Sequence, residues 1–227
     1  CSITGCIDKG KQIHDEIFSR ELLTKDIVLG TALVDMYAKC GMLIKAEQIL
    51  EELPVRNLVS WNALIAGFAQ HGKGHEALRC FEQMKKEGLS PDGVTFLSVL
   101  TACCHSGLLD DAQVLFTNMT KIYGITPNLE HHTCMLLVYG CAGHFDKVMS
   151  VIKAMPSSDY SAVWITLLGA CSKWGNLKFG KLAFDHAIQL DTSCAAPYIL
   201  MASIFSDAGM PDEAEIIDAM RLKYAGS

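Results

Sequence analysis

The sequence has few prolines, few charged residues and no long apolar stretch. Its 227 residues include six prolines, and 19% of them are charged. No apolar stretch approaches the roughly 18 residues that a membrane-spanning helix needs, so we expect no membrane insertion. Half of the residues are hydrophobic, which is the opposite of the composition of a disordered chain. The scarcity of proline beside abundant leucine, alanine, methionine and isoleucine favours helices.

The sequence also lacks an excess of positive charge. The formal net charge is −6 at pH 7. Residues 1–128 carry 12 basic and 15 acidic side chains, and residues 129–227 carry 7 and 10, so each part has a net charge of −3. A broad basic surface for nucleic acid is therefore excluded. Any binding of nucleic acid must be local and confined to a groove.

Signatures of catalysis and of metal binding are missing as well. The P-C-x-x-C element of zinc deaminases, the P-loop and the dinucleotide fingerprint are absent. The ten cysteines form no C-x-x-C pair, and we interpret them as small buried side chains in a reducing compartment. His131, His132 and Cys134 are neighbours, but consecutive helical residues diverge by about 100° and cannot face one ion. We predict no catalytic residue, no metal site and no cofactor.

An internal period of 31 to 36 residues runs along the chain. Six apolar segments end in a glycine, at Gly41, Gly72, Gly107, Gly143, Gly175 and Gly209, and Gly5 ends a seventh, partial one. A small or slim residue follows five positions later, at Gly10, Ala46, Ala77, Ala112, Val148, Gly180 and Ala214. The glycine allows the positive φ that ends a helix, and the small residue lets a second helix approach closely. Each period is thus a helical hairpin, and stacked hairpins predict an all-α, right-handed α-solenoid of helix-turn-helix repeats.

The local sequence resembles the pentatricopeptide repeat family, in its plant PLS subclass. Thr31–Gly41 (TALVDMYAKCG) is similar to its S-type repeat and Val59–Ile65 (VSWNALI) to its P-type repeat. Gly10–His14 resembles the second helix of an L-type repeat, and Glu130–Met135 the last S-type repeat. Two E-type units are suggested by Trp164–Cys171 and Pro197–Ser203.

This resemblance divides the chain into seven units. They are 1–26 (partial L-type), 27–57 (S-type), 58–92 (P-type), 93–128 (L-type), 129–160 (S-type), 161–194 (first E-type) and 195–227 (second E-type). On the same basis we expect the chain to be a carboxy-terminal portion of a longer array.

The family reads single-stranded RNA at one base per repeat, through the fifth and last residues of each unit. The four pairs here are Thr31 with Asn57, Asn62 with Asp92, Leu97 with Asn128, and Thr133 with Tyr160. The resemblance implies adenine for the first pair and uracil for the second. Leu97 offers no donor or acceptor, so the third unit should select poorly. Tyr160 replaces the usual aspartate, which leaves the base preference of its unit open.

The second residue of a repeat is usually apolar in this family and packs against base faces. Val28, Val59 and Val94 fit this role, whereas Glu130 would repel phosphates. The alternative for the valines is ordinary packing between helices. Asn62 and Asp92 have an alternative as well, namely a turn and a helix cap.

The resemblance implies a sequence-specific adaptor that binds single-stranded organellar RNA and specifies sites of C-to-U editing in a mitochondrion or chloroplast. Its implied partners are multiple organellar RNA editing factors or a deaminase-bearing protein, and the chain itself is not expected to be an enzyme. Apolar fifth residues in the E-type units, Ile165 and Ile199, predict that the carboxy-terminal part contacts protein. The alternative is a protein-binding scaffold in an organellar ribonucleoprotein, which Leu97, Glu130, Tyr160 and the acidic balance favour.

Overall fold

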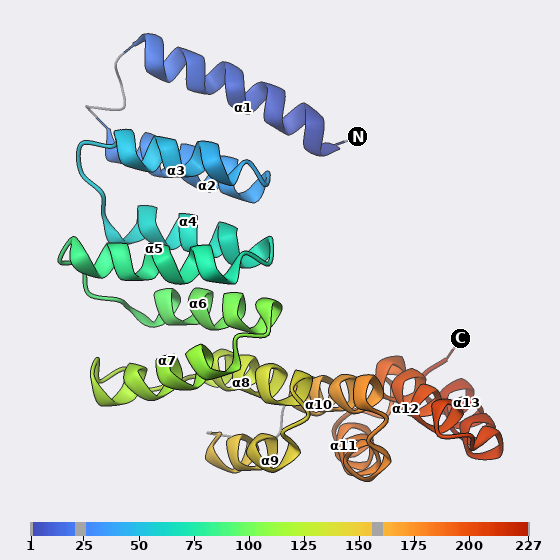
Figure 1. Cartoon of the computed structure of the whole chain (residues 1–227). Coiled ribbons are helices and arrows are strands. Elements are labelled where there is room, and N and C mark those ends of the chain that lie inside the picture. Colours follow the sequence, from blue (N-terminus) through green and yellow to red (C-terminus); the bar gives the residue numbers. More distant parts are fainter. Residues whose placement is uncertain (1, 21–25, 156–160, 227) are drawn as a thin grey trace. The chain divides into compact units, whose positions relative to one another are not determined.

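The computed structural model describes residues 2–20, 26–155 and 161–226. These residues form thirteen α-helices and no strand, and Figure 1 shows their order along the chain. The chain divides into two compact units, which we call the amino-terminal stack (Cys1–Thr126) and the carboxy-terminal stack (Pro127–Ser227). The predicted all-α stack of helix-turn-helix repeats is confirmed in each.

The amino-terminal stack contains three hairpins preceded by a single helix. Its helices are α1 (Ser2–Ser19), α2 (Ile27–Lys39), α3 (Leu43–Glu52), α4 (Leu58–Gln70), α5 (Gly74–Lys86), α6 (Gly93–Ser106) and α7 (Leu109–Lys121). The first helices of successive hairpins pack against one another, α2 on α4 and α4 on α6. Each also packs against the second helix of its own hairpin. Figure 1 shows the hairpins following one another from blue to green.

The carboxy-terminal stack repeats this arrangement. Its helices are α8 (Leu129–Cys141), α9 (Phe145–Ala154), α10 (Ser161–Trp174), α11 (Leu177–Leu190), α12 (Ala195–Asp207) and α13 (Pro211–Tyr224). Helix α8 packs on α10 and α10 on α12, while α9, α11 and α13 are the second helices of their hairpins. Aromatic contacts support the packing: the rings of Trp164 and His186 stack with centroids 4.1 Å apart.

The glycines end the first helix of every hairpin, as predicted. All six have positive φ, between 60° and 78°. Each time, the residue after the glycine donates its backbone N–H to a carbonyl five residues earlier; Leu108 bonds Cys103 in this way at 2.9 Å. A left-handed glycine closes this loop without the strain that a Cβ would add. The interpretation of Gly5 was wrong: α1 runs from Ser2 to Ser19 and passes through this glycine without ending there.

The column of small residues lies at helix contacts. Ala46, Ala77, Ala112 and Val148 are fully buried. A Cβ placed on Gly10 would lie 2.7 Å from the sulfur of Met36, so α1 meets α2 where the sequence has no side chain. These positions therefore determine how closely the helices approach.

Polar residues begin the first helices and fix where each hairpin starts. Asn57, Asp92 and Asn128 each accept a backbone N–H three residues on, and the residue at that third position bonds back to the backbone N–H of the cap. Such reciprocal capping satisfies donors that a helix start would otherwise leave unpaired. The last residue of a predicted repeat unit is thus held at the edge of the next unit's first helix.

The eight cysteines from Cys40 to Cys194 are free thiols. Cys80, Cys103, Cys134 and Cys171 are buried, as interpreted, and the other four are half-buried. Burial raises the pKa of Cys80, Cys103 and Cys171 to about 12. These three thiols are therefore protonated and unreactive at neutral pH.

Candidate nucleic-acid interface

A groove of about 500 Å³ runs across the first helices of the amino-terminal stack. Helices α2, α4 and α6 line it, together with the connection before α4. Six of the predicted site residues lie along it: Val28, Thr31, Asn57, Val59, Asn62 and Val94. Three successive repeats therefore contribute residues to one continuous surface.

The three valines form an exposed apolar stripe in this groove. The exposed fractions of Val28, Val59 and Val94 are 69%, 63% and 59%. Side chains so exposed are not packed between helices, so that alternative does not account for them. Each valine stands at the second residue of a first helix and recurs once per repeat. A flat apolar ligand could lie between successive valines.

Asn62 and Asp92 form a bonded pair beside the stripe. The amide Nδ2 of Asn62 donates to Oδ1 of Asp92 at 3.2 Å. The same carboxylate oxygen accepts the backbone N–H of Thr95 at 2.8 Å, and the hydroxyl of Thr95 lies 2.7 Å from Oδ1 of Asn62. Asp92 therefore does cap a helix, as the alternative interpretation held, and it also holds the amide of Asn62.

The ionisation of Asp92 fixes which end of the Asn62 amide faces it. Burial by itself would raise the pKa of Asp92, but hydrogen bonds from Thr95 and Asn62 outweigh it and lower that pKa below 3.8. An ionised carboxylate only accepts hydrogen bonds, so the amide must present its NH₂ group. One N–H and one carbonyl lone pair of Asn62 remain for a ligand. This donor and acceptor match the Watson–Crick edge of uracil, which offers O4 and N3–H.

Thr31 and Asn57 differ from Asn62 and Asp92 in their hydrogen bonds. The hydroxyl oxygen of Thr31 is buried and has no hydrogen-bond partner among the described residues. Asn57 caps α4 by accepting the backbone N–H of Ser60 at 2.9 Å. The Thr31 hydroxyl therefore does not share the hydrogen-bonded arrangement of Asn62 with Asp92.

The remaining predicted residues lie outside this groove. Asp92 is not part of the groove lining and reaches it only through its bond to Asn62, and Leu97 is half-buried. Asn128 caps α8 in the carboxy-terminal stack. The hydroxyl of Thr133 bonds the carbonyl of Leu129 at 2.9 Å, within its own helix. Tyr160 lies outside the described residues.

Sequence reasoning missed the part of the groove that lies one helical turn further along. Asp35, Ala66 and Ser98 line it, each four residues after a predicted residue. The helical period alone could have found them. Asp35 is the charged residue of the described lining, and Lys39 pairs with it at 2.6 Å. The groove lining therefore supplies shape and polar groups rather than positive charge.

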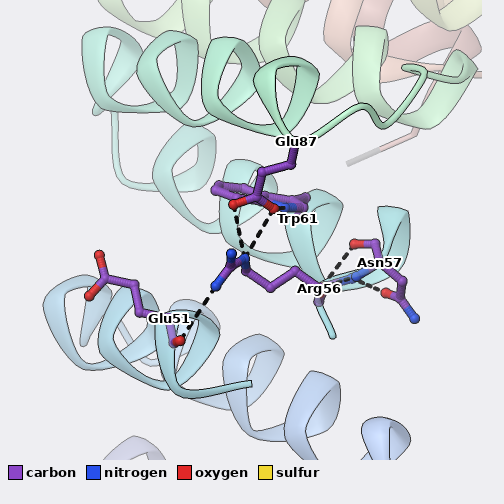
Figure 2. Close-up of polar contacts among 6 residues, drawn as sticks. Glu51, Arg56, Asn57, Trp61 and Glu87 are labelled. Atoms are coloured by element: carbon purple, nitrogen blue, oxygen red, sulfur yellow. Dashed lines mark hydrogen bonds and ion pairs between the residues drawn. The ribbon is translucent and has the colours of Figure 1, made fainter. Parts of the chain in front are cut away.

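A second set of bonds holds α4 from its opposite side. Figure 2 shows Arg56 and Trp61 converging on the carboxylate of Glu87. The indole N–H of Trp61 donates to Glu87 at 3.0 Å, and Nε of Arg56 lies 2.9 Å from the same carboxylate. Arg56 also reaches the carbonyl of Glu51 at 3.4 Å. The start of α4 is thus fixed to the end of α5, which positions Asn62 against the connection that carries Asp92.

The two neighbouring histidines of α8 take part in the cap of that helix. His131 and His132 are buried, and their Nδ1 atoms contact Asn128, the latter at 2.8 Å from its carbonyl oxygen. Within the ranges that the structure describes, no three histidine, cysteine or acidic side chains are grouped to hold a metal ion. No described helix has both the length and the apolar character to cross a membrane.

Comparison with known proteins identifies the family. The profile described as PPR repeat family matches residues 56–105, and that described as PPR repeat matches residues 31–58, 94–122 and 130–160. Together they span more than half of the chain. The chain belongs to the pentatricopeptide repeat family.

Relatives from Arabidopsis thaliana carry the name of the same family. Pentatricopeptide repeat-containing protein At3g57430, chloroplastic, is 37% identical over 94% of this chain and 24% of its own length. At1g08070, chloroplastic, is 37% identical over 94% of the chain and 29% of its length. The chain spans from about a fifth to two fifths of the curated relatives that it matches.

Solved structures show the same fold. The pentatricopeptide repeat protein PPR10 from maize has a TM-score of 0.70 and 21% identity, over 87% of this chain and 29% of PPR10. PPR10 has also been solved in complex with an 18-nt psaJ RNA element, and this form has a TM-score of 0.60.

Proposed function

We propose that this chain is a sequence-specific adaptor for single-stranded RNA. The observation that carries the proposal is the groove, in which three exposed valines recur beside Thr31 and Asn62. A repeating apolar stripe suits base faces, and polar residues at its edge suit base edges. The fold of PPR10, which was solved with an RNA element, supports the same use.

A base preference follows from two of the predicted pairs, Asn62 with Asp92 and Thr31 with Asn57. Asn62, held by Asp92, presents the donor and acceptor that uracil requires. The pairing rule of the family assigns adenine to Thr31 with Asn57. Since such arrays bind RNA with its 5′ end towards the amino terminus, the proposed sequence is adenine followed by uracil. The units with Leu97 and Tyr160 tolerate any base.

The wider role we propose is the specification of C-to-U editing sites in an organelle, within the PLS subclass and with E-type units at the carboxy terminus. The chain would position a cytidine for a deaminase domain of another protein or of its own parent. Relatives named chloroplastic support an organellar location, in a chloroplast or a mitochondrion. Multiple organellar RNA editing factors are the proposed protein partners, and the chain itself contributes no catalytic residue.

The variant Asn62→Thr tests whether the groove selects RNA bases. Threonine offers one hydroxyl in place of the amide, so the donor and acceptor pattern changes. With Asp92 retained, the family rule then favours guanine over uracil at that base. We expect the ranking of four RNAs that differ only there to change, by about three- to ten-fold in affinity, the value of one hydrogen bond. Equilibrium binding at low salt is the measurement, because the negative chain binds weakly.

A scaffold is the second candidate function. The acidic balance and the exposed Glu130 favour it. If wild type and Asn62→Thr rank the four RNAs identically, the groove does not read bases and the scaffold takes precedence. For the editing role, organellar transcripts are sequenced with and without the parent gene. Unchanged C-to-U conversion at every site would count against it, even if RNA binding is observed.

A further inference from the structure

We infer that Thr95, the third residue of the following repeat, is a positioning residue for base selection by Asn62. This inference rests on the proposed RNA-binding function and extends it from two residues to three. Thr95 belongs to α6, whereas Asn62 belongs to α4. Its side chain is fully buried, so it cannot itself contact a base.

The Thr95 hydroxyl stands between the two residues that read the base. Its oxygen lies 2.7 Å from Oδ1 of Asn62 and 2.8 Å from Oδ1 of Asp92. It also accepts the backbone N–H of Asp92 at 3.2 Å. Its one proton lies within hydrogen-bond distance of both acceptors, Oδ1 of Asn62 and Oδ1 of Asp92. The amide is therefore held from both ends, by Thr95 at its oxygen and by Asp92 at its nitrogen.

Holding the amide determines which bases fit. In the observed orientation Asn62 offers an N–H and a carbonyl in the order that suits O4 and N3–H of uracil. A rotation of the amide by half a turn exchanges the two and suits N4–H and N3 of cytosine instead. Asn62 without its clamps would accept either pyrimidine. Thr95 thus contributes to the preference for uracil over cytosine.

The preceding unit provides a matched control. Ser60 occupies the same third position in α4 and makes the same reciprocal cap with Asn57. Its hydroxyl, however, donates to the carbonyl of Asn57 at 2.8 Å, and the Thr31 hydroxyl has no described partner. Removing the Ser60 hydroxyl therefore disturbs a cap without releasing a base-reading residue.

The test compares Thr95→Val, Thr95→Ser and Ser60→Ala with the wild-type chain. Binding is measured at low salt for RNAs that differ only in the base opposite Asn62. We expect Thr95→Val to reduce the preference for uracil over cytosine by about three- to ten-fold, the worth of one hydrogen bond. Thr95→Ser, which keeps the hydroxyl, and Ser60→Ala should both keep the wild-type preference. The caps of α6 and α4 contribute to stability, so changes in stability alone do not decide the test.

A second measurement does not depend on RNA. In the free chain, the side-chain NH₂ signals of Asn62 should be distinct and slow to exchange, and in Thr95→Val or Thr95→Ala they should exchange faster. If the wild-type chain shows no base preference at all, the proposed function fails. A wild-type preference for uracil that survives in both Thr95→Val and Thr95→Ala would overturn the inference alone. Unchanged Asn62 signals in those variants would also overturn it.

Discussion

The contact between α2 and α4 allows a sharp prediction from a single methyl group. These helices carry Thr31 and Asn62, so their separation sets the spacing of the two base-reading positions. Gly67 of α4 faces Ala38 of α2, and both are buried. A Cβ added to Gly67 would lie 2.4 Å from the Cβ of Ala38 and 3.2 Å from its Cα. Neither atom can rotate away, so Gly67→Ala must push the helices apart.

The magnitude follows from two opposing effects. Carbon atoms in contact prefer about 3.5–4.0 Å, so the helices must separate by roughly 1 Å. Overpacking of this kind costs about 1–3 kcal/mol. Replacement of glycine by alanine inside a helix contributes up to about 1 kcal/mol in the favourable direction. We therefore expect Gly67→Ala to destabilise the chain by a net of up to about 2 kcal/mol.

Urea unfolding followed by circular dichroism measures this difference. Gly169→Ala is the matched control, because a Cβ at that helical glycine meets nothing within 4 Å. It should stabilise the chain by about 0.5–1 kcal/mol, the propensity gain alone. In an Ala38→Gly background, where the opposing methyl is absent, Gly67→Ala should cost at least about 1 kcal/mol less. If Gly67→Ala stabilises as much as Gly169→Ala, the close approach of α2 and α4 is refuted.

Three further predictions concern the stability of the amino-terminal stack. Ala77→Leu should cost about 1–3 kcal/mol through overpacking, and an unchanged thermal midpoint would place this residue outside the helix contact. Glu87→Ala leaves the Trp61 indole and Arg56 without their acceptor and should cost about 1–3 kcal/mol in urea unfolding, whereas Glu87→Gln, which keeps an acceptor, should cost less. The lowered pKa of Asp92 gives stability that is fully present above 3.8 and is lost as the pH falls through the folded-state pKa. Unfolding midpoints of wild type and Asp92→Asn from about pH 6 to about pH 3 should therefore converge on acidification, and parallel curves would contradict this assignment.

The hairpins could be predicted from the sequence because their signals are local. A glycine that ends a helix and a small residue at a helix contact act within a few residues, so their regular recurrence indicates the stack. Gly5 shows the limit of this reasoning, since the same pattern there lies within one continuous helix. The close contact of Gly67 with Ala38 could not be read from spacing, because it joins two repeats.

The groove was only partly accessible to sequence reasoning. The residues at the first turn of each helix could be named by their position in the repeat. Asp35 and Ser98 extend the same face by one turn and were missed. Thr95 was missed because its contacts with Asn62 and Asp92 depend on the packing of α6 against α4. Asn62 is hydrogen-bonded to Asp92 and Thr95, whereas the Thr31 hydroxyl has no partner among the described residues. This difference depends on side-chain geometry, which a pairing rule does not contain.

The central claim is that RNA bases lie on the valine stripe of the groove. Methyl signals of valine, recorded during titration with single-stranded RNA that contains adenine followed by uracil, test it most directly. Val28, Val59 and Val94 should shift, while Val114, which is 58% exposed on α7 outside the groove, should not. Shifts confined to Val114, or no shifts at low salt and saturating RNA, would contradict the account.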